Sequence, residues 1–118
     1  MIKNNYKVKD KVLNTVNSSG KSFQITLPWP IVQVIDFSDV LITRVEPKAG
    51  VIFNENVYGV DFSGNVLWQV KKRKYVYEDS PYTGMTAVGD QVKLLNWDGL
   101  ELMVEPRTGK EISKKYGR

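Results

Sequence analysis

Residues 21–27, Lys-Ser-Phe-Gln-Ile-Thr-Leu, alternate between apolar and polar side chains. Phe23, Ile25 and Leu27 fall on one side of an extended chain, and the residues between them are polar. A period of two predicts a β-strand that buries one face and leaves the other in water. The same alternation recurs at residues 100–105, which indicates that strands rather than helices organise this chain.

Two other segments are more continuously apolar. Residues 31–35 and 40–45 suit central strands that are covered on both faces. Short turns separate the strands, and Asp98-Gly99 predicts a tight two-residue hairpin. We therefore predict a single all-β domain over residues 1–118, built of about seven to nine short antiparallel strands in a meander that forms a small barrel or a sandwich. We predict that residues 1–11 form an extended or flexible arm that leads into a strand at 12–16.

The composition excludes several chemistries. The chain contains no Cys and no His, so it holds no disulfide, no thiolate nucleophile and no Ser-His-Asp triad. No calcium-loop motif is present either, and we predict no metal, no cofactor and no catalytic residue. No apolar run is long enough for a membrane helix and the N-terminal residues are polar, so we expect a cytoplasmic protein without a membrane partner.

Three hairpins in the sequence share one plan. In each, an apolar strand leads to an Asp or Asn, an aromatic residue, a tight polar turn and a second apolar strand; they span residues 35–41, 60–67 and 95–100. Residues 45–50 also match residues 104–109. The similarity has two explanations, a structural repeat or hairpins of one type that converge on the same turn residues.

Residues 57–68, Val-Tyr-Gly-Val-Asp-Phe-Ser-Gly-Asn-Val-Leu-Trp, resemble the core of a quinoprotein-type (PQQ-like) propeller repeat, and residues 105–112 are similar to its turn. The resemblance implies hairpins like those of propeller blades. It implies neither the quinone cofactor nor dehydrogenase chemistry, and the chain is too short for the roughly four blades that a closed propeller needs. As a whole, the chain looks like small proteins of Gram-positive bacteria from which no activity carries over.

The strongest charge signal is the segment 71–77, Lys-Lys-Arg-Lys-Tyr-Val-Tyr. Adjacent cations and aromatic rings are typical of surfaces that bind phosphates and stack bases. The candidate residues are Lys71, Lys72, Arg73, Lys74, Tyr75 and Tyr77. We favour the alternative of a solvated strand end protected by lysines, because Glu78 and Asp79 neutralise part of the charge and the net charge is only +4.

Two other aromatic residues are candidate contacts for a ligand or a partner. Trp29 lies between two prolines, where it either presents a platform to a ligand or plugs one end of the fold; we favour the plug. Tyr82 belongs to residues 78–84, the most loop-like stretch, which is either a binding loop or a plain connector.

Three classes of function remain. We favour a small non-enzymatic module that binds a protein partner through its aromatic hairpins. The first alternative is binding of a polyanion such as single-stranded nucleic acid through residues 71–77. The second is a carboxylate-based hydrolase, although Asp36, Asp39, Asp61 and Asp98 occupy turns where Asp serves local hydrogen bonds. Exposed strand edges further predict a homo-oligomer that pairs or covers them.

Overall fold

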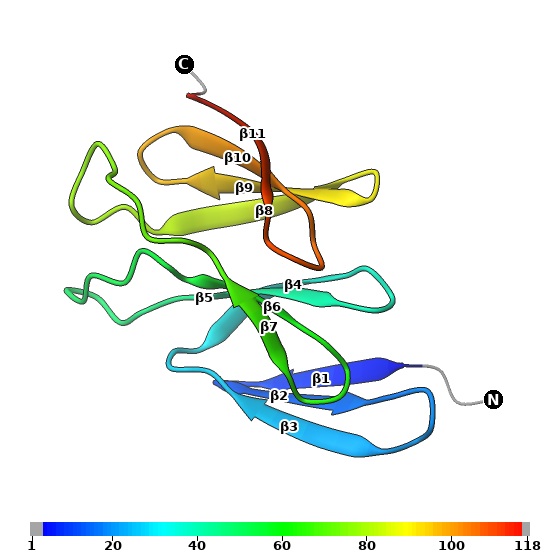
Figure 1. Ribbon diagram of the computed structural model, residues 1–118. Coiled ribbons are helices and arrows are strands. Elements are labelled where there is room, and N and C mark those ends of the chain that lie inside the picture. Colours follow the sequence, from blue (N-terminus) through cyan, green and yellow to red (C-terminus); the bar gives the residue numbers. More distant parts are fainter. Residues whose placement is uncertain (1–3, 117–118) are drawn as a thin grey trace.

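The protein folds into three antiparallel sheets that stack face to face (Figure 1). A computed structural model describes residues 4–116. The first sheet contains β1 (Asn5–Lys9), β2 (Val12–Val16) and β3 (Ser22–Thr26). The middle sheet contains β4 (Ile31–Asp36), β5 (Leu41–Val45), β6 (Val57–Val60) and β7 (Val66–Gln69), and the last sheet contains β8 (Tyr82–Val88), β9 (Gln91–Asn96), β10 (Leu100–Val104) and β11 (Glu111–Tyr116).

The middle sheet is covered on both faces, as the apolar run 40–45 predicts. In β5, Leu41 and Val45 pack in the core that includes the first sheet, whereas Ile42 packs in the core that includes the last sheet. The prediction of a central strand at residues 31–35 is wrong. β4 lies at the edge of the middle sheet, and most of its residues are only half-buried because an edge strand has one neighbour.

Two apolar cores hold the three sheets together. The core between the first and middle sheets consists of Leu13, Ile25, Leu27, Leu41, Val45, Tyr58, Val60 and Phe62. The core between the middle and last sheets consists of Val40, Ile42, Val57, Val70, Tyr82, Met85, Val92, Leu94, Leu102 and Val104. The alternation at residues 21–27 and 100–105 therefore turns the apolar face of each outer sheet towards the middle sheet.

Trp68 closes the contact between the middle and last sheets at the far edge of the stack. Its indole Nε1 donates a hydrogen bond to the carbonyl oxygen of Pro106 over 2.7 Å. The ring lies against Gly59 on the neighbouring strand and against Gly109 in the turn between β10 and β11, at positions that leave no room for a Cβ atom. Glycine is therefore required on both sides of this ring.

The all-β class predicted from the sequence is confirmed, but the number and arrangement of the strands differ. The chain forms eleven strands, and they stack as three sheets rather than as a barrel or a two-sheet sandwich. The expected arm at residues 1–11 holds β1, which pairs with β2 along its length; Met1–Lys3 lie outside the described residues. All six residues of β11 are exposed, so no apolar alternation marks this strand.

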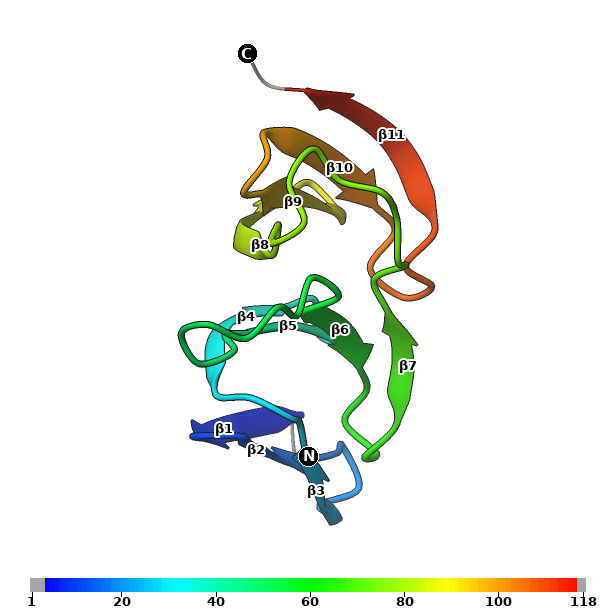
Figure 2. The same ribbon diagram turned by 90° about the vertical axis from the view of Figure 1, so that its left-hand side faces the viewer.

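The two sides of the stack differ in the strands that they expose. Figure 2 shows β1, β4 and β8 on one side and β7 and β11 on the other. The middle and last sheets have four strands each, whereas the first has three and ends at β3. None of the described residues belongs to a helix with the length and apolarity needed to cross a membrane.

The three similar hairpins occupy different places in their sheets. Residues 35–41 join a first strand to a second, residues 60–67 a third to a fourth, and residues 95–100 a second to a third. They share an Asx turn, in which the side chain of an Asp or Asn accepts a hydrogen bond from the backbone N–H two residues on. The residues are Asp36 with Ser38, Asp61 with Ser63, and Asn96 with Asp98. A shared turn type is what convergence of hairpins on the same turn residues predicts, and the structural repeat stays a prediction.

Candidate ligand-binding groove

Residues 70–81 connect β7 to β8 and carry the basic–aromatic segment 71–77. β7 ends at Gln69, so this segment lies beyond the strand, in irregular backbone. Figure 1 shows that it projects to the same side of the stack, on the left, as the loop between β5 and β6, residues 46–56. We call residues 70–81 the connector and residues 46–56 the β5–β6 loop.

Two asparagines of the β5–β6 loop hold the connector and the first residue of β8 from one side. Asn54 Nδ2 donates to the carbonyl oxygen of Glu78 over 2.7 Å, and Asn54 Oδ1 accepts from the backbone N–H of Ser80 over 2.9 Å. Asn56 is buried and bonds to both backbone groups of Tyr82, at 2.8 Å and 2.9 Å. An asparagine side chain can donate and accept at once, so each one substitutes for a pairing strand.

The turn between β9 and β10 holds the connector from the other side. Asp98 Oδ2 accepts from the backbone N–H of Val76 over 3.1 Å, and Asn96 Nδ2 donates to the carbonyl oxygen of Ser80 over 2.8 Å. The backbone N–H of Trp97 donates to the carbonyl oxygen of Pro81 over 2.9 Å. The second half of the connector is thus fixed between the middle and last sheets.

A groove of about 560 Å³ separates the β5–β6 loop from the connector. It is lined by Ile52, Phe53, Asn54, Glu55, Lys72, Arg73, Lys74, Tyr75, Tyr77 and Glu78. Five residues of the predicted segment therefore meet in one site, and only Lys71 of the six candidates in 71–77 is outside the lining. A volume of this size falls within the range of small-ligand pockets.

The charges of the groove are mixed. Lys72 and Lys74 are exposed and form no ion pair within residues 4–116. Arg73 is less available, because its Nη1 lies 2.7 Å from Oε2 of Glu111 on β11. Glu55 and Glu78 line the same groove and offset most of the positive charge. The site therefore offers separate cationic and anionic positions rather than one strongly positive surface.

A family model described as a domain of unknown function, DUF7957, matches residues 4–116. The chain belongs to this family. No curated protein matches the sequence. The description of the family assigns no activity, and the relation of the hairpins to quinoprotein repeats stays a prediction.

Three tyrosines of the DUF7957 domain, in or next to the connector, differ in how far they are buried. Tyr82 is buried in the core, and its hydroxyl lies 3.1 Å from that of Tyr75, with the rings edge to face. Burial raises the pKa of both tyrosines above the usual 10.0, most strongly for Tyr82. Tyr82 is thus a core residue that a ligand cannot reach, while Tyr75 is half-buried beside it and Tyr77 is 53% exposed.

Trp29 of the DUF7957 domain packs against the core between the first and middle sheets. The ammonium group of Lys11 lies 6.0 Å from the centre of its ring, within reach of a cation–π interaction. Pro28 and Pro30 hold it in the short link between β3 and β4, and it is not among the residues that line the groove. This packing is the one expected if Trp29 plugs one end of the fold, the alternative that the sequence favours over a platform for a ligand.

The carboxylates at turns of the DUF7957 domain hold backbone groups. Asp98 is buried and accepts from the N–H groups of Val76 and Leu100, and Glu105 accepts from those of Arg107 and Thr108. The residues 4–116 contain no cluster of side chains that could hold a metal ion.

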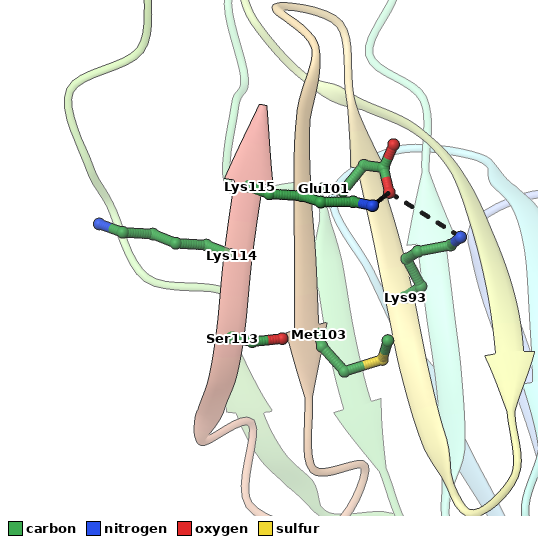
Figure 3. A pocket seen from close by; sticks show the side chains of 6 residues that line it. All are labelled: Lys93, Glu101, Met103, Ser113, Lys114 and Lys115. Carbon is green, nitrogen blue, oxygen red and sulfur yellow. Dashed lines mark ion pairs between the residues drawn. The ribbon is translucent and has the colours of Figure 1, made fainter. Parts of the chain in front are cut away.

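A second hollow of about 250 Å³ lies on the outward face of the last sheet (Figure 3). Glu101 is the one acid in its lining, with Oε1 at 3.9 Å from Lys93 Nζ and 4.0 Å from Lys115 Nζ. A glycosidase-type mechanism needs two carboxyl groups at one site, so this hollow does not provide one. Ion pairs between neighbouring strands on an exposed sheet face account for these distances.

Asn54 and Asn56 are the site residues that sequence reasoning misses. A single asparagine before a strand is typical of an ordinary turn, so neither attracts attention. The available signal is their spacing, Asn-Glu-Asn directly before the buried run 57–60. Two amide side chains beside a strand that is buried on both faces indicate backbone groups that need partners.

Proposed function

We propose that this protein is a non-enzymatic interaction module that binds an extended peptide segment of a partner protein in the groove between residues 52–55 and 72–78. The observation that supports this proposal is a groove with fixed walls whose lining combines exposed aromatic and apolar side chains with charges of both signs. Peptide segments carry all three kinds of group, so they can match such a lining.

The walls of the groove reduce the cost of binding. The side chains of Asn54 and Asp98 bond to the backbone of residues 76–80, so little chain entropy remains to be lost when a ligand orders this part of the connector. Tyr77 and Ile52 are 53% and 50% exposed at the groove. Exposed aromatic and aliphatic side chains on a rigid frame are the usual anchors of a protein interface.

Mixed charge favours a peptide over a nucleic acid. A nucleic-acid site gains its affinity from cations that displace counterions, and carboxylates beside those cations repel the phosphates. Glu55 and Glu78 lie in the lining with Lys72 and Lys74, and Arg73 is already paired with Glu111. The absence of Cys fits binding in a reducing compartment such as the cytoplasm.

Selection of peptides from a random displayed library against the native chain tests this function. We expect enriched peptides that bind the purified chain and lose about tenfold or more in affinity with Tyr77→Ala. Tyr116→Ala is the matched control, because Tyr116 is also 53% exposed but lies on β11 outside the groove. A library that yields no peptide, or binding that Tyr77→Ala leaves unchanged, contradicts the proposal.

Polyanion binding is the second candidate, supported by three exposed and unpaired lysines in the described part of the connector, Lys71, Lys72 and Lys74. Fluorescence anisotropy with a labelled oligothymidine tests it. Three phosphate contacts predict a log–log slope of about −2 for affinity against salt concentration. The triple alanine variant of these lysines should abolish that binding, and a wild-type chain that does not bind at low salt eliminates this candidate.

A further inference from the structure

We propose that the free edge of β3 is a self-association site, where β3 of a second copy pairs antiparallel and joins the two first sheets into one. This inference is independent of the proposed groove, because β3 belongs to the first sheet and none of its residues lines the groove. The sequence already predicts oligomerisation through strand edges, and the structure narrows that prediction to one edge.

The first sheet has no fourth strand next to β3. The middle and last sheets continue to a fourth strand, β7 or β11, on the side where the first sheet stops at β3 (Figure 2). β3 pairs only with β2, so the backbone groups on its other side have no strand partner among residues 4–116. Unpaired strand edges recruit other strands.

β3 lacks the features that protect the other edges. Six strands have one neighbour, namely β1, β3, β4, β7, β8 and β11. Charged residues occur in β1, β4 and β11, and the pairings of β4, β7, β8 and β11 contain a register shift. β3 reads Ser-Phe-Gln-Ile-Thr and pairs with β2 without interruption. Charges and bulges are the usual protection against edge pairing, and β3 has neither.

The sequence of β3 is complementary to itself in the antiparallel direction. A two-fold axis through Gln24 places Phe23 of one copy opposite Ile25 of the other, and Ser22 opposite Thr26. Aromatic residues opposite β-branched residues, and hydroxyl residues opposite each other, are favourable cross-strand pairs. The same operation on β11 or β1 brings together strands that each carry two lysines, which favours β3 as the edge that accepts a second copy.

Apolar surface next to this edge remains uncovered. The turn between β6 and β7 rests on β3, because a Cβ atom at Gly64 would lie 3.1 Å from Cβ of Phe23. β7 begins directly after this turn with Val66 and Leu67, which are 49% and 44% exposed. When a second copy pairs with the β3 edge, Val66 and Leu67 of both chains lie on the same side of the joined sheet.

Sedimentation velocity over about 10 µM to about 1 mM tests the proposal, since a five-residue pairing predicts a weak dimer. Gln24→Lys and Gln24→Glu each put like charges opposite each other at the two-fold axis, and each should weaken dimerisation by about tenfold or more. An equimolar mixture of the two variants should restore dimerisation, because opposite charges then face each other.

The mixture distinguishes a β3 contact from a folding defect, which mixing cannot repair. Asn14→Lys is the matched control: Asn14 is exposed and faces Gln24 in the register, but it lies on the central strand β2. This variant should dimerise like the wild type. A wild-type chain that stays monomeric up to about 1 mM, or dimers that both Gln24 variants leave unchanged, overturns the proposal.

Discussion

Trp68 of the middle sheet is in direct contact with Gly109, which lies in the turn between two strands of the last sheet. A Cβ atom at Gly109 would lie 2.6 Å from the indole Cδ2 of Trp68, and Gly109 has a φ of +72°. The same ring donates a hydrogen bond to the Pro106 carbonyl oxygen over 2.7 Å. The turn between β10 and β11 is thus shaped around one side chain of β7, and this contact fixes the last sheet against the middle sheet.

Gly109→Ala should destabilise the fold by about 2–4 kcal/mol, because the added methyl group overlaps the Trp68 ring in addition to straining the backbone. The matched control is Gly50→Ala, since Gly50 has a φ of +88° but no atom within 4 Å of an added Cβ. That variant should cost about 1 kcal/mol for backbone strain alone. Urea unfolding of both variants measures the difference, and equal losses would show that the contact with Trp68 is not tight.

Asn56→Ala should cost about 2–4 kcal/mol. The side chain makes three hydrogen bonds, to the Val45 carbonyl oxygen and to both backbone groups of Tyr82, and its loss leaves buried polar groups unpaired. Asn65→Ala is the control, because Asn65 is exposed and its side chain bonds only to Asp61. Thermal unfolding should show a much smaller decrease for this variant. Similar decreases for the two variants would contradict the role assigned to Asn56.

Thr15→Val should destabilise the protein by about 1–2 kcal/mol although the shape of the side chain is preserved. The Thr15 hydroxyl is buried and donates to the carbonyl oxygen of Phe62 over 2.9 Å, which links the first sheet to the middle sheet. Thr86→Val, at an exposed position of β8, should change stability by less than about 0.5 kcal/mol. Chemical denaturation of the two variants checks this prediction, which fails if Thr15→Val is neutral.

Stability should fall in alkaline solution because of the buried tyrosines. Burial raises the pKa of Tyr58, Tyr75 and Tyr82 above the 10.0 expected in the unfolded chain. The folded state therefore binds more protons above pH 10. The stabilisation is complete below pH 10 and is lost as the pH rises through the pKa of each folded tyrosine.

The expected slope is up to about 1.4 kcal/mol per pH unit for each tyrosine that stays protonated in the fold. Urea unfolding at intervals from pH 8 to 12 measures it. Tyr82→Phe should reduce the slope, because it removes the most strongly shifted of the three hydroxyl groups. A slope that Tyr82→Phe does not change would show that this hydroxyl ionises normally in the folded protein.

Parts of the candidate site follow from the sequence because they depend on neighbouring residues. Lys72, Arg73 and Lys74 stand out as a charged run, and the structure brings them into one groove with Tyr75 and Tyr77. Tyr82 lies in the core instead, since it follows the end of the connector and begins a strand. The pairing of Arg73 with Glu111 joins residues far apart in the chain, so no local pattern announces it.

The sequence by itself determines most of the strands, their inward faces and the turns between them. Alternating side chains such as Phe23 and Ile25 select a face, and an Asp or Asn such as Asp61 closes a turn within a few residues. These are local effects, so a short window of sequence contains them.

Only the tertiary structure decides that the strands form three stacked sheets, that the exposed segment 111–116 is a strand, and that Asn56 has a buried role. Each of these depends on partners distant in sequence: β10 supplies the hydrogen bonds of β11, and Tyr82 supplies those of Asn56. Backbone groups must find partners wherever they are buried, and which partner is available depends on how the sheets pack.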